Sequence, residues 1–351
     1  MLVGQGSRSA RPSVRRQARS HIIRVSPIIA ALLGLALVVY LIIDSGAEQV
    51  AHAMLLVGWG LVPITLFHLI PMLFSALSWR DLLPRSSRLD IGSLMWIRWI
   101  RESINTLLPV AGVGGDVVCA RLAQLRGVPH AQAVASMVVD TTVGAATQLV
   151  FATIGVALLL THSTEPAVLA IARVALIAIC TFYVAIAVFL LFQHRGMLSV
   201  SARLAGVLLR TERISNIADG ASAIDDAVIG VYRDRLALCR ATLLRLVAWA
   251  MGTGEIWLVL QFSGRSIGVI DAFTLESLGA GVRAVAFMVP GQMGVLEVSF
   301  VMFGALYGLP AQTALTISFC RRVRELALGV PGLFVWHWIE AQHLLRHRAR
   351  L

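Results

Sequence analysis

Long apolar blocks alternate with polar stretches along the whole chain. A helix needs about 20 apolar residues to cross a bilayer. Six blocks approach or exceed that length, over about residues 26–43, 54–77, 131–160, 167–192, 242–262 and 312–336. The pattern predicts an all-α polytopic membrane protein with about six transmembrane helices.

Two further apolar segments, over residues 94–118 and 271–299, are interrupted by proline and glycine. The first ends in Pro109-Val-Ala-Gly-Val-Gly-Gly-Asp116, and the second contains Pro290-Gly-Gln-Met-Gly-Val-Leu-Glu297. Proline and closely spaced glycines break helices. Irregular backbone at membrane depth is tolerated only where protein or a water-filled cavity satisfies its polar groups. We therefore expect each segment to enter the membrane as a broken, re-entrant hairpin.

The two broken segments are related by an internal repeat. A shift of 181 residues places the first motif on the second and Gly127-Val-Pro129 on Gly308-Leu-Pro310, with six identities in 25 positions. The spans that follow the two hairpins are expected to run in opposite directions. The repeat halves, about 94–192 and 271–340, are therefore predicted to be inverted. Inverted repeats with broken helices build the substrate sites of many transporters.

The composition agrees with a membrane protein. Hydrophobic residues make up 58% of the chain and charged residues only 14%, whereas a typical soluble domain has about 25% charged residues. The net charge of +11 comes from arginine, because the chain holds no lysine. These arginines cluster between the apolar blocks, as topology determinants do. We therefore expect no nucleic-acid partner.

The distribution of arginine also predicts the orientation, since cytoplasmic segments carry the excess of basic residues. Arginine is concentrated in the N-terminal tail 1–25, the loop 193–240 and the C-terminal tail 341–351. A single arginine, Arg265, occurs in the three loops 44–53, 161–166 and 263–270. We expect one membrane domain over 26–340 in a bacterial inner membrane. Both termini and the amphipathic loop 193–240 would then be cytoplasmic.

Charged side chains lie inside or beside several apolar segments. Each costs about 2.5–3.5 kcal/mol at a helix centre, so exposure to lipid without a partner is not expected. Two interpretations stay open: ion pairs that only hold the bundle together, or a polar cavity for a head group or a proton. The candidate cavity residues are Glu102, Asn105, Pro109, Gly114, Gly115, Asp116, Asp140, Arg283, Pro290, Gly291, Gly294, Glu297, Arg321 and Glu325.

The repeat suggests partners for these charges. Glu102 matches Arg283 and Asp140 matches Arg321 at the shift of 181 residues, so opposite charges could pair across the two halves. Arg321 could instead pair with Glu325 four residues later on the same helix.

The two repeat-related acids, Asp116 and Glu297, are predicted to line one shared polar cavity, with Arg283 and Arg321 as cationic partners. Asp116, directly after two glycines, also fits a helix cap, and Glu297 fits that role less well. His68, which lies within an expected span, is interpreted as a packing residue.

Metal and cofactor motifs are not expected. The four cysteines stand alone, without the CxxC spacing of a zinc site, and the nine histidines are scattered. The chain also holds no HExxH, G-x-S-x-G or P-loop motif. We therefore predict no catalytic residues, no metal and no cofactor.

The motifs themselves resemble a known family. The run from Glu102 to Asp116, the motif that begins at Pro290, and Arg321-Arg-Val-Arg-Glu325 are similar to those of the flippase-like membrane domain family. That family includes the transmembrane region of lysylphosphatidylglycerol synthases. The resemblance covers about residues 25–340 and is closest to the hopanoid-biosynthesis-associated branch. Gln292-Met293 departs from the small residues that relatives often have there.

The resemblance implies translocation of a polar-headed or polyisoprenoid-derived lipid, such as a hopanoid, between leaflets, with a membrane lipid as substrate. It does not imply lysyl transfer, because the soluble transferase domain of the bifunctional relatives has no counterpart in this sequence. Two alternatives stay open. One is an integral membrane enzyme of lipid or hopanoid biosynthesis, and the other is a scaffold that binds such enzymes through the cytoplasmic loop.

Overall fold

The computed structural model describes residues 39–40, 43, 47–108, 114–162, 166–196, 214–286 and 292–348. These residues form helices joined by short turns, which confirms the expected all-α class. Several predictions lie outside the described residues: the tail 1–25, most of the span 26–43, Pro109, Pro290 and Gly291.

Four of the predicted spans are confirmed as helical stretches that are long and apolar enough to cross a membrane. They are Val50–Leu82, His130–Thr161, Val168–His194 and Arg235–Phe262. The span predicted at 312–336 lies within α14 (Ala311–Arg348), a helix of 38 residues that contains Pro331. Its apolar run is interrupted by charged residues between Arg321 and Glu325.

The first of these stretches is a composite of several short helices. It begins with α2 (Ala47–Val57), passes through the 3-10 turn Gly58–Gly60 and α3 (Leu61–Phe67), and ends with α4 (Leu69–Leu82). Pro71 has no N–H to donate to the carbonyl four residues earlier, and the chain makes a turn at the preceding His68. The interruption places His68 at the junction between α3 and α4.

Two pairs of helices flank the predicted hairpin tips. The first pair is α5 (Ile91–Leu107) and α6 (Gly114–Leu125), and the second is α12 (Val269–Val285) and α13 (Val295–Leu306). Adding 181 to the bounds of α6 gives those of α13, and α7 (His130–His162) and α14 begin in the same register. The boundaries of the helices therefore coincide with the register of the sequence repeat.

The helix α5 begins at a capping residue outside the long spans. Asp90 accepts hydrogen bonds from the backbone N–H of Ser93 at 2.9 Å and from the Ser93 hydroxyl at 2.6 Å. These bonds favour the ionised carboxylate and lower the pKa of Asp90. The cap satisfies a backbone donor that the first turn of the helix would otherwise leave free.

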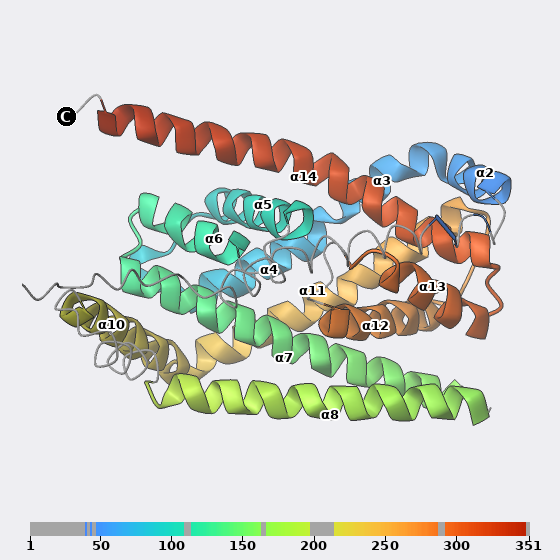
Figure 1. Cartoon of the computed structure of the whole chain (residues 1–351), viewed down its shortest axis with the longest axis horizontal. Coiled ribbons are helices and arrows are strands. Elements are labelled where there is room, and N and C mark those ends of the chain that lie inside the picture. Colours follow the sequence, from blue (N-terminus) through green and yellow to red (C-terminus); the bar gives the residue numbers. More distant parts are fainter. Residues whose placement is uncertain are drawn as a thin grey trace, which may run out of the picture.

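The most extensive helix contacts in the described part join helices that are far apart in the sequence. The helix α5 packs along α14, α12 packs along α7, and α4 packs along α11 (Arg235–Phe262). Figure 1 shows α5 and α6 toward the end of the bundle where α10 and the C-terminus lie, and α12 and α13 toward the other end.

On the outside of this bundle, α8 (Pro166–His194) lies beside α7, and α10 (Ile214–Arg233) covers one end of both (Figure 1). Val228 of α10 is buried against apolar residues of α4, α7 and α11. An amphipathic helix within the loop 193–240 was predicted, and α10 is that helix.

Glycines allow two of the close helix contacts. A Cβ atom on Gly155 of α7 would lie 1.8 Å from the Ser277 hydroxyl oxygen of α12. A Cβ atom on Gly332 of α14 would lie 2.1 Å from the Ser103 hydroxyl oxygen of α5. Small residues at such points let helix backbones approach closely in a membrane, where hydrophobic attraction between helices is lost.

We predict that Gly155→Ala destabilises the protein by about 1–3 kcal/mol, because overpacking forces α7 and α12 apart. Thermal unfolding of the purified protein in detergent measures the effect. Gly144→Ala on the same helix is the control, since its Cβ would make an ordinary 3.4 Å contact with Arg245. Equal melting temperatures for the two variants would contradict the prediction.

Candidate functional site

A buried cluster of ion pairs centres on Asp140 of α7. Its carboxylate accepts hydrogen bonds from Arg98 Nη1 of α5 and from Arg245 Nη2 of α11, both at 2.7 Å. Arg101 Nη1 lies 3.5 Å from the same carboxylate. Asp140 is fully buried, so this one charge ties three helices together.

The helix α6 joins this cluster through its first turn. The Asp116 carboxylate pairs with Arg101 Nε and accepts a hydrogen bond from the Thr141 hydroxyl at 2.9 Å. Asn105 Oδ1 accepts the backbone N–H of Gly115 at 2.8 Å. A Cβ atom on Gly115 would lie 2.4 Å from the Arg101 carbonyl oxygen, so the close contact between α5 and α6 requires glycine there.

A second network occupies the space between α12, α13, α14 and α11. Glu276 of α12 accepts hydrogen bonds from Arg283 Nη2 at 2.7 Å and from Arg321 Nη2 of α14 at 2.6 Å. Arg321 lies over the ring of Phe300, with 5.4 Å between Cζ and the ring centroid. These contacts place Arg283 and Arg321 beside one shared carboxylate.

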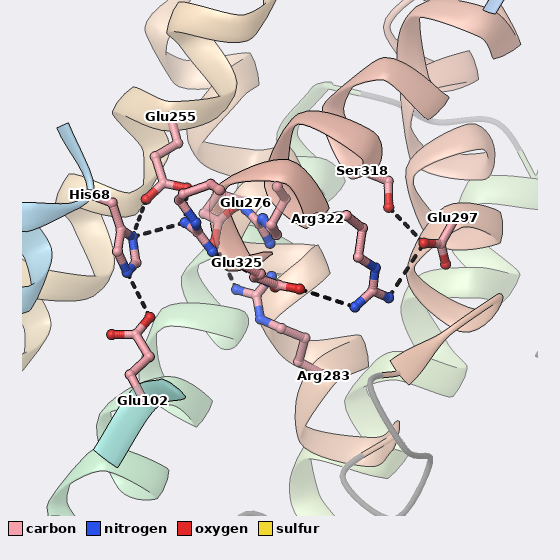
Figure 2. A network of polar contacts seen from close by, with 11 residues as sticks. His68, Glu102, Glu255, Glu276, Arg283, Glu297, Ser318, Arg322 and Glu325 are labelled. Atoms are coloured by element: carbon pink, nitrogen blue, oxygen red, sulfur yellow. Dashed lines mark hydrogen bonds and ion pairs between the residues drawn. The ribbon is translucent and has the colours of Figure 1, made fainter. Parts of the chain in front are cut away.

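Glu297 belongs to the same side of the bundle (Figure 2). Its Oε2 accepts the backbone N–H of Gly294 at 2.8 Å, which caps α13. Its Oε1 accepts the Ser318 hydroxyl at 2.9 Å and lies 3.4 Å from Arg322 Nη2. Arg322 also donates to Glu325 at 3.1 Å.

His68 lies at the other end of this network, between carboxylates of two helices (Figure 2). Its Nε2 is 2.6 Å from Glu102 Oε1 of α5, and its Nδ1 is 2.5 Å from Glu255 Oε1 of α11. Arg324 of α14 pairs with Glu255, and Arg324 Nη1 also lies 2.8 Å from His68 Nδ1. The imidazole therefore links α5, α11 and α14.

One carboxylate of this group faces open space. The Glu102 side chain is 42% exposed, whereas that of Glu255 is 7% exposed. A small cavity of about 20 Å³ adjoins the group, and its lining includes His68, Glu102, Thr106, Arg324 and Glu325. Glu102 is thus the accessible end of the His68 group and Glu255 the buried end.

A larger groove runs beside the network. It has a volume of about 560 Å³ and is lined almost entirely by apolar residues of α7, α8, α12 and α13, including Val156, Ala178, Val282, Val285, Val295 and Phe303. The helices α12 and α13 contribute to both features. Arg283 and Glu297 belong to the polar network, while Val282 and Val295 face the groove.

The structure corrects the predicted partners. Glu102 pairs with His68 and not with Arg283, and Asp140 pairs with Arg98 and Arg245 and not with Arg321. The predicted contact between Arg321 and Glu325 is replaced by the pair of Arg321 with Glu276. Helix rotation decides these choices, because it sets which carboxylates each arginine can reach.

The expectation for the two repeat-related acids is corrected as well. Asp116 pairs with Arg101, and Glu297 contacts Arg322, so Arg283 and Arg321 are not their direct partners. The two acids lie in separate clusters of ion pairs within the described residues. Glu297 caps its helix by accepting the Gly294 N–H, although the sequence favoured this role less for Glu297.

Sequence reasoning left eight charged or titratable members of the site out of the candidate residues: His68, Arg98, Arg101, Arg245, Glu255, Glu276, Arg322 and Arg324. Three of them stand alone in apolar spans. His68 was interpreted as a packing residue, and Arg245 and Glu255 received no role. Each is an isolated polar residue in an apolar span, which was the available signal. Within the described residues, no group of three or more His, Cys, Asp and Glu side chains could hold a metal ion.

One of three comparisons with known proteins identifies a family. The family model described as "Lysylphosphatidylglycerol synthase TM region" matches residues 28–332. No curated protein matches this chain. No solved structure matches it either.

We predict that Asp140→Asn destabilises the protein by about 3–5 kcal/mol, because it leaves Arg98 and Arg245 buried without an opposite charge. Glu340→Gln is the matched control, since the Arg121–Glu340 pair is partly exposed and should contribute about 0–1 kcal/mol. Both values come from thermal or denaturant unfolding in detergent. Similar losses for the two variants would show that the Asp140 cluster does not hold the bundle together.

Proposed function

The chain belongs to the lysylphosphatidylglycerol synthase transmembrane region family, and from this membership we propose that it moves a polar-headed lipid between the two leaflets of the membrane. The substrate is a membrane lipid, and a polyisoprenoid-derived lipid such as a hopanoid is the specific candidate. The protein would act as a transporter and not as an enzyme.

One observation carries the proposal: α12 and α13 present charged residues to the interior and apolar residues to a groove of about 560 Å³. A membrane lipid has the same two parts, a polar head and apolar chains. The groove could hold the chains while the head group passes the polar interior. Buried charge in a membrane protein commonly marks a pathway for a polar substrate.

We further propose that α5–α6 and α12–α13 are re-entrant hairpins of an inverted repeat. The helices α6 and α13 have 12 residues each. Such helices are about 18 Å long, which is less than the roughly 30 Å of a hydrocarbon core. The matching register of the helix boundaries and the placement of the two pairs toward opposite ends (Figure 1) support this proposal.

A strain that lacks the gene tests the function. We expect an unchanged set of lipids with one lipid in an altered distribution between the leaflets. A missing lipid together with an accumulated precursor would indicate an enzyme or a scaffold for enzymes instead. Lipid extraction after selective labelling of the outer leaflet separates these outcomes.

The wild-type gene should restore the normal lipid distribution in the strain that lacks it. We predict that a gene with Ala178→Trp on α8 does not, because the indole fills the groove that Ala178 lines. Protein level and melting temperature should stay close to those of the wild type. Ala185→Trp is the control, since Ala185 is an exposed residue of the same helix outside the groove. Full rescue by Ala178→Trp would remove the groove from the transport pathway.

We propose an inner-membrane location with both termini in the cytoplasm, and the two ends of α11 offer a test. Cys239 is an exposed native residue near the start of α11, and Ser266 is exposed beyond its end. In a Cys180→Ala background, an impermeant maleimide should label Ser266→Cys in intact cells and Cys239 only after permeabilisation. If Cys239 is labelled in intact cells and Ser266→Cys only after permeabilisation, the orientation is the reverse of the one proposed.

A further inference from the structure

The contacts of His68 require one proton more than a neutral imidazole carries. Both ring nitrogens lie within 2.6 Å of a carboxylate oxygen, one from Glu102 and one from Glu255. Ionised carboxylates only accept hydrogen bonds, and a neutral imidazole donates only one. Each contact is therefore a hydrogen bond only if a second proton resides on the ring or on one of the two carboxyl groups.

Some of the charges around this group favour binding of the second proton, and others oppose it. The charged groups around it are Glu102 and Arg98 on α5, Glu255 on α11, and Arg321, Arg324 and Glu325 on α14. The carboxylates favour the proton. Arg324 opposes it, because Nη1 lies 2.8 Å from His68 Nδ1 and places a donor opposite a donor when that nitrogen is protonated.

The formal charges of the two ion-pair clusters also favour and oppose the second proton. The network in Figure 2 holds five carboxylates against four guanidinium groups, so an imidazolium at His68 makes it neutral. The neighbouring Asp140 cluster has two carboxylates and three guanidinium groups. The two clusters together are neutral without the proton and carry one positive charge with it. The second proton completes the hydrogen bonds of His68 but adds one positive charge to the two clusters together. These opposing effects allow the group to gain and lose the proton.

We propose that the Glu102–His68–Glu255 group is a proton relay that couples lipid movement to the transfer of one proton, which rests on the proposed transport function. Glu102 is the entry, because its side chain is the accessible one and adjoins the small cavity. Glu255 is the buried end. Sequence separations of 34 and 187 residues show that the group forms only in the folded bundle.

The relay moves one proton from water to Glu255 in three steps. A hydronium ion gives its proton to the Glu102 carboxylate and leaves as water. Glu102 passes this proton to His68 Nε2, so Glu102 is again a carboxylate and the ring is an imidazolium. The proton on Nδ1 then moves to Glu255 Oε1, which leaves a neutral ring protonated on Nε2 and a neutral acid at Glu255.

Protonation of Glu255 has a mechanical consequence. Its ion pair with Arg324 holds α11 against α14, and a neutral acid no longer attracts the guanidinium. Arg324 Nη2 already lies 3.8 Å from Glu325 Oε1, which offers a second partner on its own helix. One proton thus releases a contact between α11 and α14.

The proton site can be tested without any lipid transport. We suggest magic-angle-spinning NMR of the full chain, labelled with nitrogen-15 histidine, in phosphatidylcholine vesicles. His68→Gln identifies the His68 signal by its loss, and His337→Gln, at an exposed position, is the control. We expect a doubly protonated ring at neutral pH that becomes neutral as the pH rises, and that does so at lower pH in Glu102→Gln. A ring in one protonation state throughout the titration would overturn the proposal.

The coupling has its own measurement. Vesicles of phosphatidylcholine and phosphatidylglycerol carry a trace of fluorescent NBD-phosphatidylglycerol, and dithionite reports the fraction in the outer leaflet. A gradient of one pH unit can bias the leaflet ratio by up to about tenfold for one proton per lipid. We expect this bias in the wild type and in His337→Gln, and its loss in His68→Gln.

Exchange without a bias in the wild type would overturn the coupling. If the wild type moves no probe lipid, the transport proposal fails for that lipid, and the NMR titration still decides whether the proton site exists.

Discussion

The cost of an unpaired charge away from water governs the interior of this bundle. Asp140, Glu255, Glu276 and Glu297 are all buried, and each has at least one arginine partner from a neighbouring helix. Breaking a buried pair by removing one partner typically costs about 3–5 kcal/mol. Each pair therefore restricts the rotation of two helices about their axes. The polar network specifies the arrangement of the helices as much as the apolar contacts do.

Much of the fold could be predicted from the sequence because the bilayer imposes a simple rule on apolar blocks. The spans near residues 54–77, 131–160, 167–192 and 242–262 follow directly from their length and hydropathy. The breaks beside Gly114 and Gly294 follow from proline and glycine chemistry. The span predicted at 312–336 differs from the other four, because arginines interrupt its apolar run near the centre.

The partners within the site could not be predicted in the same way. All seven charged candidate residues do lie in the ion-pair clusters, because a charge in an apolar segment is informative by itself. Which acid meets which arginine depends on helix rotation, and rotation depends on contacts such as those at Gly115 and Gly155. His68 shows the limit most clearly: Arg324, one of its partners, is 256 residues away in the chain.

The apolar groove is formed by helices at the outside of the bundle, including α8, most of whose surface is left uncovered by the other described residues. A ligand that enters there comes from the lipid phase and not from water. Its effective concentration is then its mole fraction among the surrounding lipids, which is unaffected by dilution of the whole sample. Bulk phospholipids would compete for the same groove at high occupancy. Selectivity would therefore have to come from a difference in affinity against abundant competitors, and not from tight binding alone.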